Sequence, residues 1–207
     1  MIDPDDGSDS FMIAVEEAIS YGGLTYAEDV VQQFNIASQH VLLLLEDAAV
    51  TFARGSYGTS AFLAITALEE TSKAEILTFR IQAPGGPRKK GGDPLRSHTK
   101  KHALAVRPTT FIGRLPVILG EETCARLRQD AATGALNRLR EEAIYFGLSV
   151  DGTVTAPTKA VSKARAAEIV LLALEAADDI LVGWTNESYH LTQRLETLIG
   201  QVPGAHR

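Results

Sequence analysis

The chain has 207 residues, of which 45% are hydrophobic, and a formal net charge of −6. This length suffices for one sizeable core, and the acidic balance argues against a protein that coats nucleic acid along its whole surface. The single cysteine, Cys124, excludes an intrachain disulfide, and the sequence has neither a CxxC motif nor a Cys/His cluster for zinc. We expect a globular protein of a reducing compartment that needs no metal and no cofactor.

Residues 1–24 are expected to form a leader that is partly disordered or contains a short helix. Its start, MIDPDDGSDS, is acidic and lacks the basic start and apolar run of a secretory signal. The longest unbroken aliphatic run, Val41 to Leu45, is far shorter than the roughly 20 apolar residues of a membrane-spanning helix. These features predict a cytoplasmic protein with no membrane partner.

Helical periodicity begins after the leader. Thr25 is expected to cap a long helix that runs to about Arg54, because apolar residues recur there at spacings of three and four. A turn from Gly55 to Gly58 separates it from a second helix, roughly Thr59 to Ile81. In that helix Glu69 and Lys73 lie four residues apart, in the order that favours an ion pair.

A loop rich in glycine, proline and charge is predicted for residues 83–93. Asp93 is expected to cap the next helix, with Pro94 at its first position. The opening turns of this helix then contain side chains that can bind an anion or transfer a proton: Arg96, His98, Lys100, Lys101 and His102.

The second half of the chain is also predicted to be helical. A helix is expected from Glu121 to about Phe146, with Arg140 and Tyr145 near its end. Residues 148–159 alternate weakly and predict an extended excursion or a small hairpin. A last helix should start after Ser162 and reach Ile199. Residues 25–200 are therefore expected to form one all-α domain, an antiparallel bundle with loop insertions, followed by a tail at 201–207.

Positive charge is concentrated in one segment. Residues 88–107 contain seven of the 20 lysines and arginines and one acid, Asp93. His98 and His102 are four apart and would share a helix face. An imidazole titrates at about pH 6.5 and can move a proton, while a guanidinium suits a phosphate. The pattern predicts a site that handles phosphate; a solvated basic surface and a dimer contact remain the alternatives.

Three segments in order resemble a known family. They are FLAITALEETSKAEILTFR at 62–80, RSHTKKH at 96–102 and RLREEAIYFGLSVDGTVTAP at 138–157. Together they resemble the abortive-infection protein AbiV of the HEPN superfamily, and the resemblance spans about Ala27 to Leu198.

The resemblance implies an all-helical domain that forms a homodimer and places two copies of its motif in a shared cleft. Many HEPN proteins are metal-independent endoribonucleases of phage defence, whose motif is Arg, four to six residues, then His. Arg96 and His102 fit that motif, and the AbiV pattern of His and Lys falls on His98 and Lys101. Arg96 would hold the phosphate, and either histidine would be the catalytic one, which gives 2′,3′-cyclic phosphate ends.

Further residues would support such a site. Glu69 and Lys73 would lie behind it, and the candidates for RNA or phosphate contacts are Lys100, Lys101, Arg140 and Tyr145. The alternatives are a structural ion pair for Glu69 and Lys73 and a core position for Tyr145.

Other functions remain open at this point. The main alternative is a noncatalytic HEPN protein that blocks phage growth or translation by binding RNA, a phage-encoded protein or the translation machinery. A purely structural helical scaffold is a third hypothesis. The Glu-x-x-His spacing that ends at His190 is typical of di-iron bundles, but the sequence holds no second copy, and we expect no metal there.

Overall fold

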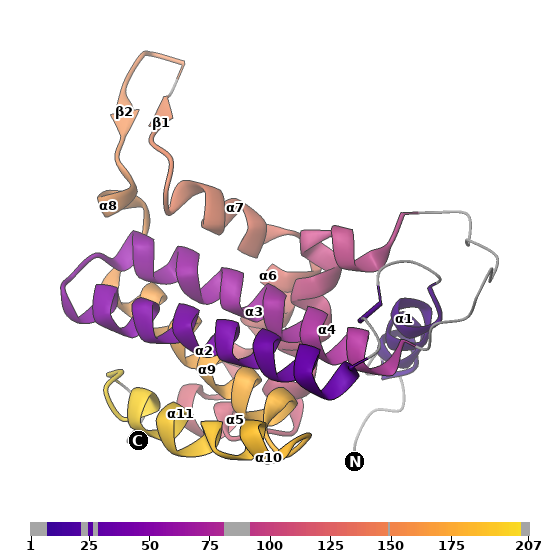
Figure 1. Cartoon of the computed structure of the whole chain (residues 1–207). Coiled ribbons are helices and arrows are strands. Elements are labelled where there is room, and N and C mark those ends of the chain that lie inside the picture. Colours follow the sequence, from indigo (N-terminus) through magenta and orange to yellow (C-terminus); the bar gives the residue numbers. More distant parts are fainter. Residues whose placement is uncertain (1–7, 22–24, 27–28, 81–91, 149, 204–207) are drawn as a thin grey trace.

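The computed structural model describes residues 8–21, 25–26, 29–80, 92–148 and 150–203, and most of them are helical (Figure 1). The helices of the first half are α1 (Ser8–Ser20), α2 (Val30–Ala53), α3 (Tyr57–Phe79), the 3-10 turn η1 (Pro94–Arg96), α4 (His98–Phe111) and α5 (Leu115–Leu119). Those of the second half are α6 (Glu121–Ala132), α7 (Ala135–Glu142), α8 (Pro157–Ala160), α9 (Lys163–Leu181), α10 (Asn186–Tyr189) and α11 (Leu191–Ile199). The prediction of an all-α bundle with insertions is confirmed.

The centre of the bundle is formed by α2, α3 and α9, and α4 and α6 extend it (Figure 1). Helix α9 is buried over most of its length, and its aliphatic side chains fill the main core. Helix α3 presents small residues to both neighbours, with Ala61, Ala64 and Ala67 fully buried. Small side chains let helix backbones approach closely, so α3 can pack in the middle of the domain.

Helix α2 begins later than predicted. Its N-cap is Asp29, whose carboxylate accepts a hydrogen bond from the backbone N–H of Gln32 at 2.9 Å, so the expectation for Thr25 was wrong. By length and mean hydropathy α2 is long and apolar enough to cross a membrane. The sequence prediction of no such segment considered only the unbroken aliphatic run from Val41 to Leu45, which lies within α2. The core helix of a soluble protein meets the same test, and one face of α2 packs into the main core.

The connection from α3 to α4 differs from the prediction in its cap. Most of the predicted loop lies outside the described residues. Asp93 caps η1, where its side chain accepts from the N–H of Leu95, and it pairs with Arg80 at the end of α3. Ser97 is the N-cap of α4. Arg96 therefore ends η1, and α4 starts at His98.

Two helices predicted to be continuous are broken by glycine. The segment 121–146 divides into α6 and α7 at Gly134, which has a φ of +75°. The segment 162–199 starts as predicted after its N-cap Ser162, but α9 ends before Gly183, which has a φ of +91°. Left-handed backbone ends a right-handed helix, and glycine adopts it without steric cost. Thr185 then caps α10 through a capping box with Ser188.

The predicted hairpin is present between α7 and α8. Strands β1 (Gly147–Leu148) and β2 (Val154–Thr155) pair antiparallel, with Gly147 opposite Thr155. Figure 1 shows the hairpin projecting from the bundle beyond α7 and α8. Its apolar side chains, Leu148, Val150 and Val154, are exposed.

The N-terminal leader contains a helix, α1. It packs on α3, η1 and α4 through a small second core made of Ala18, Ile76, Leu95 and Leu104. Val202, two residues after the predicted domain boundary at residue 200, is also buried. Cys124 lies in the core as a free cysteine, where burial raises the pKa of its thiol.

Candidate functional site

The first two turns of α4 direct three basic side chains toward α3. Ser97 caps this helix, so its regular geometry starts at His98. Positions i, i+3 and i+4 share a helix face, which brings His98, Lys101 and His102 together. All three contact one residue of the neighbouring helix, Glu69 of α3.

Glu69 uses both carboxylate oxygens in these contacts. Its Oε2 lies 2.8 Å from Nδ1 of His98 and 2.7 Å from Nζ of Lys101. Its Oε1 lies 2.9 Å from Nε2 of His102. Helix α7 adds a fourth neighbour, because Nη1 of Arg140 donates to the same Oε1 at 3.2 Å. One carboxylate therefore joins α3, α4 and α7, and we call these five residues the Glu69 cluster.

Solvent reaches the Glu69 cluster at one end. Glu69, Lys101 and His102 are buried, and His102 has no exposed surface. The His98 side chain is 42% exposed, and Arg140 is partly exposed beside it. A substrate could touch His98 and Arg140 without any movement of the core.

The hydrogen-bond partners fix which ring nitrogen of each imidazole donates to Glu69. An ionised carboxylate can only accept, so Nδ1 of His98 and Nε2 of His102 are the donors. In His98 the other ring nitrogen, Nε2, carries a lone pair whenever the imidazole is neutral, and this side chain is exposed. In His102 the other ring nitrogen is Nδ1, which is buried and has no hydrogen bond within the part of the chain that the structure describes. Nη1 of Arg140 and Nδ1 of His98 lie 3.3 Å apart. Because both donate to the carboxylate of Glu69, this short distance is not a hydrogen bond between them.

The charges of the cluster favour an ionised Glu69. Burial alone would raise the pKa of Glu69, but hydrogen bonds from His102, Lys101 and His98 outweigh it and hold this pKa far below its usual range. The carboxylate is therefore ionised over the whole physiological range. Lys101 and Arg140 carry two positive charges against the one negative charge of Glu69, so the cluster by itself is net positive.

Several predicted site residues lie away from the cluster. Arg96 ends η1 and is exposed, and its side chain makes no hydrogen bond or ion pair with the described residues. Lys100 is exposed and pairs with Glu17 of α1 at 3.3 Å. The predicted pair of Glu69 and Lys73 was wrong: Lys73 pairs with Glu70 on the surface, because Glu69 turns inward.

Tyr145 does not occupy the core position that was its alternative. It is exposed and lines a cavity of about 780 Å³ between the end of α7 and the hairpin. Arg140 lines the same cavity, so the cavity and the Glu69 cluster share this residue. The neighbouring aromatic, Phe146, was missed by the sequence reasoning, although its place directly after Tyr145 and before Gly147 was a usable signal.

A comparison with models of protein families matches residues 35–177 to AbiV, a HEPN family. This match covers well over half of the chain. The chain belongs to the AbiV family. The resemblance inferred from three sequence segments is thereby confirmed, and this AbiV protein is assigned to the abortive-infection HEPN proteins. Comparisons with curated proteins and with solved structures gave no significant match.

The match to AbiV contains the complete Glu69 cluster, from Glu69 on α3 to Arg140 on α7. It ends before the Glu-x-x-His segment at 187–190, where His190 is exposed. Among the described residues of this AbiV chain, no three His, Cys, Asp or Glu side chains lie close enough to hold a metal ion together.

Proposed function

We propose that this AbiV protein is a metal-independent endoribonuclease in which His98 is the general base and Arg140 binds the scissile phosphate. One observation carries the proposal: Nδ1 of His98 lies 2.8 Å from Glu69 and 3.3 Å from the Arg140 guanidinium, while the His98 side chain is 42% exposed. A carboxylate behind an imidazole fixes its tautomer and orientation and stabilises the imidazolium that forms. His98 therefore fits the role better than His102, which is fully buried.

The proposed reaction is an attack within the RNA strand. Nε2 of His98 takes the proton of a ribose 2′-hydroxyl while the 2′-oxygen forms a bond to phosphorus. The bond from phosphorus to the 5′-oxygen breaks, and that oxygen takes a proton from water. The products are a 2′,3′-cyclic phosphate and a 5′-hydroxyl. Proton transfer of this kind contributes about 10²- to 10⁴-fold to a rate.

Arg140 supplies the complementary charge. Its guanidinium is partly exposed, and Glu69 and the rest of α7 hold it in place. A guanidinium can donate two parallel hydrogen bonds to the nonbridging phosphate oxygens and offset the charge that grows on them during attack. Arg96 and Lys100, which lie outside the cluster, are assigned to the path of the RNA strand toward it.

The test is cleavage of a mixed RNA in EDTA by the purified protein, with analysis of the product ends. We expect wild type to give cyclic phosphates and His98→Ala to lose at least about 10²-fold in rate. His190→Ala is the matched control, because His190 is an exposed histidine outside the cluster. Retained cleavage in His98→Ala, together with loss in a folded His102→Ala, would overturn the assignment.

The second candidate function is inhibition by binding, directed at RNA, a phage-encoded protein or the translation machinery. Exposed apolar side chains on α2 and on the hairpin favour it, because such surfaces commonly mark contacts with partners. If the protein acts by binding in the cytoplasm of the host cell, His98→Ala would leave phage defence unchanged. Defence that depends on His98 would instead support cleavage.

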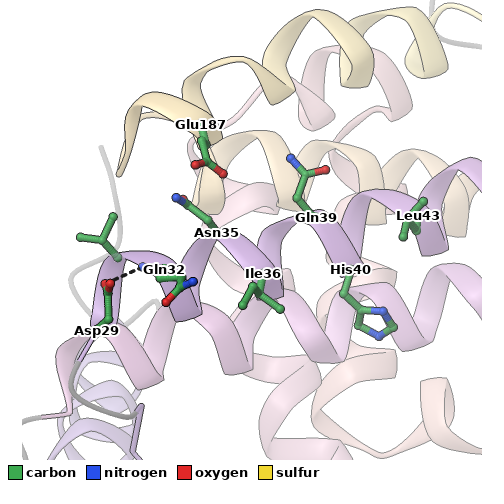
Figure 2. Close-up of a pocket in the computed structure, with 9 residues that line it drawn as sticks. Asp29, Gln32, Asn35, Ile36, Gln39, His40, Leu43 and Glu187 are labelled. Carbon is green, nitrogen blue, oxygen red and sulfur yellow. Dashed lines mark hydrogen bonds between the residues drawn. The ribbon is translucent and has the colours of Figure 1, made fainter.

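We also propose that the protein is a homodimer that pairs through α2. Ile36, Leu43 and Val50 lie seven residues apart on its outer face, and each is 56–58% exposed. Figure 2 shows Ile36, His40 and Leu43 following one another along the helix, beside a groove of about 680 Å³ that Glu187 of α10 helps to line. A second copy on this stripe would also cover the exposed apolar side chains that contribute to the high mean hydropathy of α2.

A two-fold axis at Leu43 makes this stripe self-complementary. In an antiparallel pair of α2 helices, Ile36 would meet Val50 of the other copy, and His40 would meet Glu46. No like charges would face each other across the axis, since Asp47 would meet Gln39. The Glu69 cluster lies on α3, α4 and α7, so this pairing differs from the shared cleft that the resemblance implies and leaves the cluster of each copy outside the interface.

A further inference from the structure

We propose that the cavity between α7 and the hairpin is a subsite for one nucleobase of a single-stranded RNA, next to the phosphate held by Arg140. This inference rests on the proposed function and names a part of the substrate that the Glu69 cluster itself does not contact. It also assigns a role to the hairpin, which adds nothing to the core.

The cavity has the lining that a base requires. Tyr145 and Phe146 border it with rings that are each 69% exposed, and Leu148 adds an aliphatic wall. Exposed aromatic rings are costly to keep in water, and a base that stacks on them removes that surface from solvent. Every nucleobase presents a flat face, so such a platform accepts a strand of any sequence.

The position of the cavity couples base and phosphate. Arg140 lines the cavity and also contacts both Glu69 and His98. A nucleotide whose base stacks on the rings therefore carries its phosphate toward the guanidinium of Arg140, which lies beside His98. Single-stranded RNA is recognised in this way, by aromatic stacking combined with positive charge along the backbone.

Two carboxylates at the cavity predict a preference among bases. Glu141 and Glu142 line it and are exposed. They repel a phosphate from the cavity itself, so the base and not the backbone is the group that enters. A carboxylate accepts hydrogen bonds only, and the amino groups of adenine, cytosine and guanine are donors. Uracil has no amino group, and its one ring donor, N3–H, lies between two carbonyl oxygens that a carboxylate repels, so it is expected to bind least well.

The experiment measures binding separately from cleavage. Fluorescently labelled oligonucleotides of A, C or U with 2′-O-methyl riboses cannot be cleaved by attack of the 2′-oxygen. Their affinity for full-length protein is compared between wild type, the double variant Tyr145→Ala/Phe146→Ala and Val150→Ala. Val150 is the matched control, because it is an exposed apolar residue of the same hairpin that does not line the cavity.

We expect the double variant to weaken binding at least about tenfold, since it removes both rings on which a base can stack. Val150→Ala should bind as wild type does. Oligo-A and oligo-C should bind more tightly than oligo-U, and Glu141→Gln/Glu142→Gln should reduce that difference. Equal losses in the double variant and in Val150→Ala, or no binding by wild type, would overturn the subsite.

Cleavage of ordinary RNA by the same preparations separates this inference from the proposed function. Binding that depends on Tyr145 and Phe146 without any cleavage would sustain the subsite and remove the ribonuclease. Cleavage that depends on His98 but not on the two rings would sustain the ribonuclease and remove the subsite.

Discussion

Glu69 is the residue on which the local stability of the site depends. Its carboxylate is buried and accepts from two histidines, a lysine and an arginine on two other helices. A buried ion cluster of this kind adds little to stability when intact, because desolvation opposes its attractions. Removal of one partner is much more costly, since it leaves buried charge without compensation.

The substitution Glu69→Gln tests this dependence. The amide keeps the size of the side chain but leaves Lys101 without a counter-ion, and we expect the free energy of unfolding to fall by about 3–5 kcal/mol. Urea denaturation of both proteins at neutral pH measures the change. Glu70→Gln is the control, because Glu70 pairs with Lys73 near the surface, and its effect should stay below about 1 kcal/mol.

The same residue predicts how stability depends on acid. The pKa of folded Glu69 lies well below the value of about 4.5 expected for the unfolded chain. Its stabilising contribution is therefore fully present above about pH 4.5 and is lost as the pH falls further. The difference in unfolding free energy between wild type and Glu69→Gln should shrink below pH 4.5, whereas a constant difference would contradict this linkage.

Glu75 is expected to show the opposite dependence. It is partly buried on α3, and burial raises its pKa to about 7. The folded protein then holds a proton that the unfolded chain releases at about pH 4.5, so stability falls as the pH rises from 4.5 through 7. Glu75→Gln should therefore raise stability by about 1–2 kcal/mol at pH 8 and leave it nearly unchanged at pH 4. Thermal unfolding of wild type and Glu75→Gln at pH 4 and pH 8 measures this difference.

Among the elements, α3 and the end of α7 meet in one tight backbone contact. Gly58 lies in the first turn of α3, where an added Cβ would stand 2.6 Å from the carbonyl oxygen of Ala143. That atom belongs to the backbone and cannot rotate away. The approach is therefore available only to glycine, and it sets the distance between the helix that bears Glu69 and the helix that bears Arg140.

The substitution Gly58→Ala tests this contact. Alanine favours a helix by about 1 kcal/mol over glycine, but we expect the clash to dominate and the net loss of stability to be about 1–3 kcal/mol. RNA cleavage should fall with it, since Arg140 is displaced. Gly92→Ala is the control, because a Cβ there meets nothing within 4 Å. A Gly58→Ala protein as stable as wild type would show that α7 yields freely.

The helices were largely predictable from sequence, and their breaks were not. Periodicity gave the two long N-terminal helices to within a few residues, because a buried face repeats along a helix whatever it packs against. Gly134 and Gly183 interrupt equally periodic segments. A glycine inside a helical pattern is tolerated as often as it breaks the helix, and tertiary packing decides which occurs.

For the site, helical spacing groups the members of one helix turn, whereas Glu69 was expected behind the site only from the family resemblance and with Lys73 as its partner. His98, Lys101 and His102 follow from spacing alone. Glu69 is 29 residues from His98, and its role depends on a long-range contact that also prevents the predicted pair with Lys73. Burial is the reason that we propose His98 rather than His102, and no local pattern reports the burial of a polar residue.

On the scale of the whole molecule, the outer face of α2 determines the assembly that we propose. Leu43→Arg places a charge on the two-fold axis and should convert a dimer into a monomer in light scattering. Val117→Arg is the control, because Val117 is an exposed apolar residue on α5, away from α2. A wild-type monomer at working concentrations would contradict the assembly.

Cross-linking tests the proposed register. A short bismaleimide should join two copies of Leu43→Cys, since this residue meets itself across the axis. Ile36→Cys alone should not react with itself, but a mixture with Val50→Cys should. Cys124 is buried and does not interfere. Efficient self-coupling of Ile36→Cys would place the axis elsewhere.

The position of Glu69 between three helices also affects what a genetic screen would recover. The residue that orients His98 is the residue that holds α3, α4 and α7 together, so many changes that remove activity at this point also loosen the fold. Survivors of selection against a toxic copy would then include variants that are degraded in the cell rather than present and inert. Measuring the amount of protein in each survivor would separate the two groups, and changes at the exposed His98 should dominate the group that accumulates normally.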